Sequence, residues 1–301
     1  MKILLYLLLL TTYVAFTQNK PIDESLITGK VENLDKDTLF HKYNFVEGDT
    51  LEYRLESGDS VLVNWDSPLI KERYERIIIT CDSVDEKTGH FFLTHEYDLI
   101  TGKEFKNLYP EKEIDFHQWL NKKVTIEIDS IGKRYSFKYH DSTSSGSTAG
   151  GPFQGLIIQP IGQKSSILES SWIELNDTTK YAENSYPAPT MIRTDLFENK
   201  GNTDTLDYEV VRVDISFTGN GEFFIHDKEA SFYISSLTNG HSENYISTEL
   251  GIPIWAYYTQ EQQFEVNYGG EKTSKGMHFT YTLFELDKFV PGKARKKTDD
   301  N

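Results

Sequence analysis

The histidines and the single cysteine are the side chains whose chemistry would first suggest a catalytic or metal site. His90 and His95 lie five residues apart, and on a β-strand that spacing turns two side chains to opposite faces, so they are poor ligands for one metal ion. Cys81 is the only cysteine; it continues the apolar alternation of Ile79 and is followed directly by Asp82. Because a reactive thiol needs an electropositive neighbour, we expect a buried structural thiol rather than a nucleophile.

The glycine-rich segments do not match catalytic motifs. The run GSTAGG at residues 146–151 lacks the G-x-S-x-G spacing of a serine hydrolase, and GGEKT at residues 269–273 lacks the Gly-Lys-Thr of a phosphate-binding loop. The chain has 47 Asp and Glu residues, and no spacing singles out the two carboxylates that a glycoside hydrolase needs. We therefore predict a protein that is not an enzyme, with no catalytic, cofactor-binding or metal-binding residues.

Aromatic residues are the most informative remaining feature, with 4 Trp, 18 Tyr and 18 Phe among 301 residues. Several tyrosines on predicted strands combine an apolar ring with a polar hydroxyl and could line a groove where apolar or sugar faces stack. Packing in the core is the alternative interpretation of each. These tyrosines are Tyr53, Tyr135, Tyr139, Tyr233, Tyr257 and Tyr258.

Alternating apolar and polar residues predict hairpins along most of the chain. Residues 51–55 and 61–65 alternate on either side of a Ser-Gly-Asp-Ser turn at 57–60, and residues 124–128 and 135–139 alternate around a turn at 130–133. Further turns are expected at 101–102, 227–230 and 268–271. Only one short helix is predicted, at residues 115–120, where Phe116, Trp119 and Leu120 share a face and Asp115 could cap.

One segment has an echo in the second half of the chain. IIITCDSVDEKTGHFFL at residues 77–93 and EVVRVDISFTGNGEFFI at residues 209–225 both suggest a strand, a glycine turn and an aromatic return strand. The echo favours a duplicated meander, although aromatic hairpins with a turn glycine resemble one another in any case. The predicted fold is all-β: two antiparallel meanders forming a curved sheet, half-barrel or sandwich, with few short helices.

The predicted organisation begins with a signal peptide at residues 1–17, where a positive start precedes an apolar run and small residues. The chain then continues with a polar leader (18–39), a first β-meander (40–140), a Ser/Gly-rich linker or loop (141–151), a second β-meander (152–290) and a polar tail (291–301). The basic run at residues 293–297 is expected to be a solvated end.

After cleavage we expect no integral membrane span and an extracytoplasmic location, periplasmic or secreted. The net charge of −16 excludes a general nucleic-acid binder.

Four phrases carry a resemblance to other proteins: YNFVEGDTLEYRL, IEIDSIGKRYSF, ILESSWIEL and GEFFIHDKEASFYIS. With the predicted signal peptide, they resemble exported Gram-negative bacterial all-β proteins of unassigned function. The layout is remotely similar to lipoprotein-carrier half-barrels, in which a curved antiparallel sheet wraps around helices. That resemblance supplies no catalytic residues.

Export, acidity and the missing catalytic motifs lead to one main hypothesis. The chain is an exported, non-enzymatic binding or envelope-associated protein that holds an apolar or glycan ligand on an aromatic-lined concave sheet. The alternatives are a secreted carboxylate-dependent hydrolase and a structural or adhesive protein with an envelope partner.

Overall fold

The computed structural model describes residues 42–64, 66–106, 112–116, 119–141, 157–161, 171–176, 190–226, 231–268 and 273–295. All of them belong to one compact unit, Asp37–Asn301. The second unit, Met1–Lys36, holds the predicted signal peptide and most of the predicted leader and lies outside the described residues. Residues 142–151 of the predicted linker lie outside them too.

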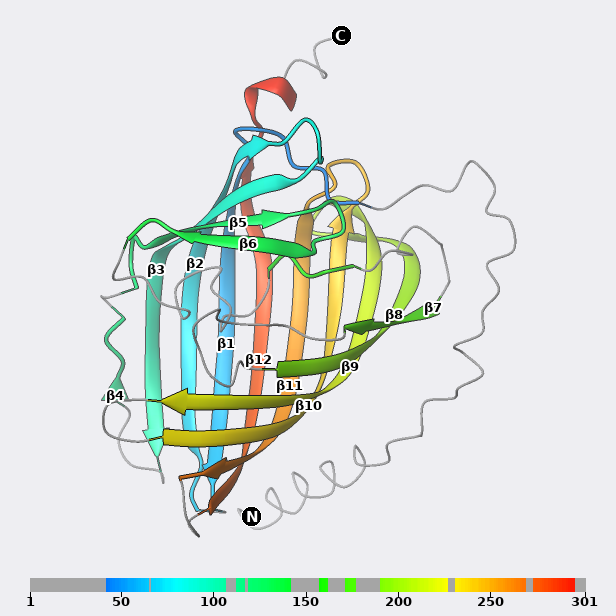
Figure 1. Ribbon diagram of the computed structural model, residues 1–301. Helices are drawn as coiled ribbons and strands as arrows, with labels where there is room; N and C mark the ends of the chain where they lie inside the picture. Colours follow the sequence, from blue (N-terminus) through cyan, green and yellow to red (C-terminus); the bar gives the residue numbers. More distant parts are fainter. Residues whose placement is uncertain are drawn as a thin grey trace, which may run out of the picture. The chain divides into compact units, whose positions relative to one another are not determined.

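The fold is a single antiparallel sheet, curved and not closed into a barrel (Figure 1). Eleven strands follow one another in the order β6-β5-β3-β2-β1-β12-β11-β10-β9-β8-β7, and β4 pairs with β3. The all-β prediction is therefore confirmed, since β1 to β6 and β7 to β12 form two meanders joined by the pairing of β1 with β12. The strands are β1 Thr50–Val63, β2 Leu69–Val84, β3 Phe91–Lys106, β4 Lys112–Glu113, β5 Lys123–Ile128, β6 Arg134–Tyr139, β7 Ser171–Asn176, β8 Thr190–Thr205, β9 Tyr208–His226, β10 Ser231–Ser247, β11 Pro253–Asn267 and β12 Thr273–Val290.

Strict alternation gives the sheet two different faces. The inner face carries the core, with side chains such as Leu51, Tyr53 and Ile79 almost fully buried. The segment 157–161 lies on this face, where Ser242 Oγ donates a hydrogen bond to Gln159 Oε1 at 3.2 Å. The outer face is formed by the residues that alternate with these core positions, such as Arg54 and Glu56 on β1. No helix among the described residues is long and apolar enough to cross a membrane.

Two of the predicted turns are wrong because glycines lie inside strands. β1 runs unbroken through Gly58, where a hairpin was predicted. A Cβ on Gly58 would lie 2.3 Å from Cε1 of Tyr281, so the glycine makes room for a ring from the neighbouring strand. Gly102 likewise lies within β3, and a Cβ there would lie 2.7 Å from the carbonyl oxygen of Glu72.

The echo between the two halves does not extend to the structure. The first copy is a hairpin as predicted, with β2 ending at Val84, Gly89 at φ 72° and β3 starting at Phe91. The second copy, residues 209–225, lies wholly inside the single strand β9, so its glycine turn is wrong. This copy has two glycines, Gly219 and Gly221, and Gly221 is the one that aligns with Gly89. A Cβ on Gly219 would lie 3.0 Å from the carbonyl oxygen of Ile192 on the adjoining strand, so close packing accounts for Gly219.

The predicted helix at 115–120 is wrong for the residues that the structure describes there. Trp119–Asn121 forms a turn, in which Trp119 N donates to Phe116 O at 2.8 Å and Asn121 has φ 59°. The hairpin of β5 and β6 is confirmed, with Gly132 at φ 81° and Asp129 Oδ1 accepting from two backbone amides of the turn. The turns predicted at 227–230 and 268–271 lie outside the described residues, apart from Tyr268.

The basic tail is not a fully solvated end. Lys293–Arg295 forms a helical turn after β12, and the side chain of Arg295 is 10% exposed because it packs against the buried carboxylate of Asp49. Residues 296–301 lie outside the described residues.

Candidate functional site

A pocket of about 520 Å³ lies on the outer face where β8, β9, β10 and β11 adjoin. Its first wall is the end of β8, residues 200–205. Its second wall is made by Arg212, Tyr245 and Trp255 from the next three strands. The pocket thus sets a polar strand end against two aromatic rings and a guanidinium group.

A β-bulge shapes the first wall. The register of β8 against β9 shifts between Asn199 and Gly201, and the backbone amide of Gly201 donates to Asn199 Oδ1 at 2.9 Å. Gly201 has φ 86°, a conformation that favours glycine. A bulge bends its strand and adds local twist, which here redirects the end of β8 beside the pocket.

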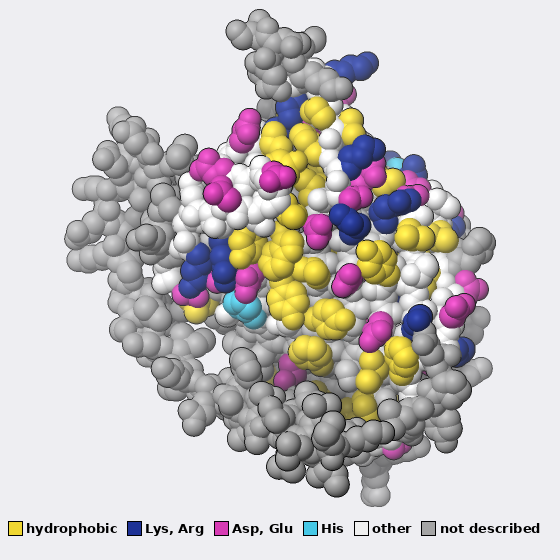
Figure 2. All heavy atoms as spheres, turned by 180° about the vertical axis from the view of Figure 1, so that it is seen from behind, with side chains coloured by type: hydrophobic (Ala, Val, Ile, Leu, Met, Phe, Trp, Pro, Cys, Tyr) yellow, Lys and Arg dark blue, Asp and Glu magenta, His cyan; other side chains and the backbone are white. Residues whose placement is uncertain are grey.

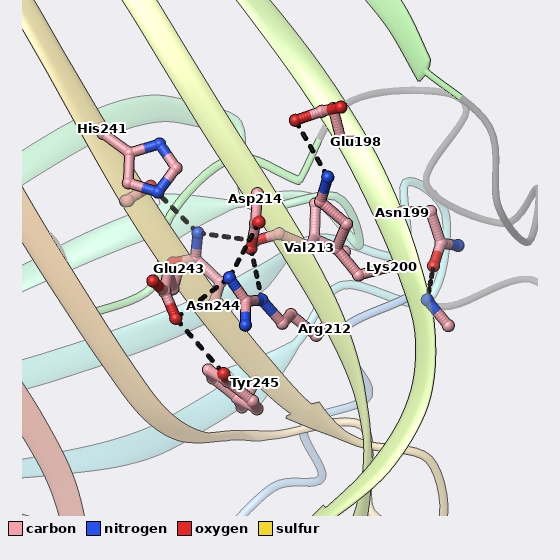
Figure 3. A network of polar contacts seen from close by, with 12 residues as sticks. Glu198, Asn199, Lys200, Arg212, Val213, Asp214, His241, Glu243, Asn244 and Tyr245 are labelled. Carbon is pink, nitrogen blue, oxygen red and sulfur yellow. Dashed lines mark hydrogen bonds and ion pairs between the residues drawn. The ribbon is translucent and has the colours of Figure 1, made fainter.

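Three carboxylates lie beside the pocket in a row across β8, β9 and β10. Glu198, Asp214 and Glu243 occupy directly opposed positions on β8, β9 and β10. Like charges in such positions repel, so the row needs cations. Arg212 and Lys200 supply them, as Figure 3 shows.

Arg212 is held by two of these carboxylates. Its Nε and Nη2 donate to Oδ1 and Oδ2 of Asp214 at 2.7 and 2.9 Å, and Nη2 also lies 3.2 Å from Glu243 Oε2. Hydrogen bonding to Asp214 raises the pKa of the guanidinium above its usual value, so the group stays charged. Lys200 Nζ lies 3.1 Å from Glu198 Oε2.

The aromatic wall follows from the pairing of β10 with β11. Tyr245 and Trp255 are opposed residues, and their ring centroids are 5.0 Å apart with an interplanar angle of 83°. Tyr257, two residues further along β11, stacks on Trp255 at 6.5 Å and 28°. The hydroxyl of Tyr245 donates to Glu243 Oε2 at 3.2 Å, which joins the aromatic wall to the carboxylate row.

The six tyrosines predicted to line a groove do not come together. Tyr53 is buried in the core, with its hydroxyl donating to Pro253 O, and Tyr258 faces inward on the same face as the core. Tyr257 faces outward beside the pocket. The other three tyrosines are exposed elsewhere on the sheet: Tyr135 and Tyr139 lie on β6, and Tyr233 lies on β10.

The sequence prediction missed Arg212, Tyr245 and Trp255. The alternation of Trp255 and Tyr257 could have identified an aromatic strand face, but nothing in the sequence pairs it with Arg212. The aromatic-lined concave sheet stays a prediction, because the aromatic wall of this pocket lies on the outer face.

The remaining candidate residues are far less suited to chemistry. Cys81 is fully buried, as predicted, and burial raises the pKa of its thiol to about 12. His95 is 4% exposed, and burial lowers its pKa to about 3. His90 lies elsewhere, with Nδ1 2.8 Å from Glu127 Oε1. Within the part of the chain that the structure describes, no three His, Cys, Asp or Glu side chains could hold a metal ion.

A second charged cluster lies on the inner face across β2, β1 and β12. Asp59 Oδ1 is 2.8 Å from His278 Nε2, and Arg73 lies 3.5 Å from Asp59 and 3.3 Å from Glu75. Burial raises the pKa of Glu75. Burial also tends to raise the pKa of Asp59, but the hydrogen bond from His278 and the charges of Arg73 and His278 outweigh this effect, so the pKa of Asp59 is lowered. Each charge has an opposite partner, so the cluster ties the two meanders together where they meet.

Comparisons with known proteins place the chain in no family. No family model matches, and no curated protein matches. A solved structure titled "Lipid-protein interactions in lipovitellin" is similar, with 10% sequence identity and a TM-score of 0.49. That likeness covers 83% of this chain and 26% of the other, so this chain spans about a quarter of its length.

Proposed function

We propose that this chain is an exported, non-enzymatic binding protein that holds an uncharged glycan in the pocket on its outer face. The observation that carries the proposal is the pair of aromatic rings, Tyr245 and Trp255, which line a pocket of about 520 Å³ together with a polar strand end. The predicted signal peptide and the location outside the cytoplasm are part of the proposal. N-terminal sequencing of the protein recovered from cells tests them, with Gln18 as the expected first residue.

A glycan suits this mixture of walls because a sugar has both apolar ring faces and hydroxyl groups. Aromatic rings contact the ring faces, and amide, hydroxyl and carboxylate groups bond the hydroxyls. The polar wall offers such groups from Asn202, Thr203, Asp204 and Thr205. A ligand with both kinds of surface can therefore use the whole pocket.

The charges around the pocket favour an uncharged ligand. Lys200 is paired with Glu198, and Arg212 is paired with Asp214 and Glu243. An anionic sugar would have to compete with these carboxylates for the two cations, and the net charge of the chain, −16, would repel it as well.

The same ion pairs argue against a hydrolase. Glycoside hydrolysis needs one protonated carboxyl group to act as general acid. Asp214 and Glu243 share a nitrogen of Arg212, so one guanidinium group engages both carboxylates. Two carboxylates held by one side chain form a structural ion pair and do not flank an open position for a glycosidic bond.

The test is binding of the purified mature chain to immobilised neutral polysaccharides (cellulose, xylan, chitin, mannan, laminarin and starch) in parallel with a panel of phospholipid vesicles. We expect retention on at least one polysaccharide, and loss of about tenfold in affinity for Trp255→Ala, because the principal ring is removed. Tyr135→Ala is the matched control, since Tyr135 is 51% exposed on the distant strand β6. Binding to vesicles alone, or to nothing, overturns the proposal.

A further inference from the structure

We infer that the ligand is a glycan chain longer than the pocket, which continues along a row of aromatic side chains on the outer face; this rests on the proposed function. The row, here called the aromatic track, starts at Trp255 and Tyr257 on β11 and continues to Tyr281 on β12. From Tyr281 it extends along β12 to Phe279 and, across β1, to Tyr74 on β2. Figure 2 shows hydrophobic side chains gathered on this side of the molecule, with charged and polar side chains among them.

Tyr281 is the second platform of the track. A Cβ on Gly58 would lie 2.3 Å from Cε1 and 2.8 Å from Cζ of Tyr281, so the ring lies over Gly58 in the space that a side chain there would fill. Tyr281 therefore lies over Gly58 on the outer face, where a sugar ring can contact it.

The register makes the track continuous with the pocket. Tyr257 on β11 is opposed to Leu283 on β12. Tyr281 is two residues from Leu283 on β12, so Tyr257 and Tyr281 are diagonal neighbours. Phe279 lies two residues before Tyr281 on β12 and is 41% exposed. On the far side, Tyr74 is opposed to Glu56, next to Gly58, and is 43% exposed.

Polar side chains on β1 and β11 interrupt the track, and this separates a glycan from a lipid or a protein as its occupant. Glu56 lies between Leu283 and Tyr74, Thr259 is opposed to Tyr281, and Glu261 is opposed to Phe279. A dry apolar partner would have to bury these groups without hydrogen bonds, which is costly. The hydroxyl groups of a sugar chain can bond them while its ring faces cover the aromatic rings.

The experiment measures the affinity of gluco-, xylo-, manno- and chito-oligosaccharides from two to eight sugars by calorimetry, using the series that the polysaccharide panel selects. We expect affinity to rise with length beyond the disaccharide. Tyr281→Ala should weaken binding of the longest oligosaccharide about tenfold and leave the disaccharide unchanged. Trp255→Ala should weaken both, and Tyr281→Phe, which keeps the ring, should weaken neither.

Gly58→Ala gives an independent check, because it displaces the ring of Tyr281 without removing it. We expect it to act like Tyr281→Ala on the longest oligosaccharide, in protein whose circular dichroism shows it folded. Equal affinity for all lengths, with Trp255→Ala still harmful, overturns the track and leaves the pocket standing. If the wild-type protein binds no glycan, both the aromatic track and the proposed function are overturned.

Discussion

Arg295 Nη2 lies 2.7 Å from Oδ2 of Asp49, which joins residues near the two ends of the described chain. The carboxylate of Asp49 is fully buried and also accepts hydrogen bonds from the backbone amides of Val46 and Gly292. The guanidinium group donates to Leu250 O as well. One ion pair thus ties the start of β1 to the residues that follow β12, at the pairing that joins the two meanders.

We predict that Arg295→Ala lowers the free energy of unfolding by about 3 kcal/mol, because it leaves a buried carboxylate without its cation. Urea unfolding followed by circular dichroism measures the loss. Lys293→Ala is the matched control: its side chain is exposed in the same tail, and we expect a change below about 0.5 kcal/mol. A loss for Arg295→Ala no larger than that of the control would show that water replaces the guanidinium group.

His95 should make the protein less stable as the pH falls. Burial, with a smaller contribution from Arg134, lowers its pKa in the folded state to about 3, against 6.5 in the unfolded chain. Between those values the unfolded chain binds one more proton, so stability falls by up to about 1.4 kcal/mol per pH unit from this residue alone. In His95→Phe the slope of unfolding free energy between pH 6 and 4 should be smaller by that amount. An unchanged slope, or an NMR titration of His95 near 6.5, contradicts the prediction.

The local features of the fold could be predicted from the sequence, and the close contacts between strands could not. The hairpin of β5 and β6 has both alternating strands and a glycine, Gly132, that adopts a positive φ. Gly58 and Gly219 give the same signal in the sequence, but they lie inside strands because Tyr281 and Ile192 pack against them. Those neighbours are more than twenty residues away, so a local pattern cannot reveal them.

The same limit applies to the candidate site. The alternation of the strands predicted buried Cys81, but the pocket depends on which strands are neighbours and in which register. Trp255 meets Tyr245 because β10 pairs with β11 after a register shift, and Arg212 meets Tyr245 because β9 pairs with β10. No residue type or spacing in the sequence predicts which strands pair or in which register.

The turn between β8 and β9 is a place where the protein can be made more stable. Leu206 and Asp207 both have positive φ, 49° and 66°, in a two-residue turn that favours Asn and Gly. We predict that Leu206→Asn combined with Asp207→Gly raises the free energy of unfolding by about 1 kcal/mol. Leu206→Ala is the control and should give no gain, since alanine also disfavours positive φ. Equal stability of all three proteins would show that the turn is not strained.

Cys81 should be unreactive until the protein unfolds. Its side chain is fully buried, and burial, with the charges of Asp49 and Asp82, raises the pKa of the thiol to about 12, so almost no thiolate exists at pH 8. We expect iodoacetamide to label the native protein only at the rate of unfolding and to label it fully in urea, with mass spectrometry as the readout. Cys81→Ala should keep glycan binding, whereas Cys81→Ser should lose about 1 to 3 kcal/mol of stability by burying a hydroxyl group that the unfolded chain exposes to water. Labelling of the folded protein at the rate of a free thiol would mean that Cys81 is accessible, and the strand it lies on would then have to open in the native state.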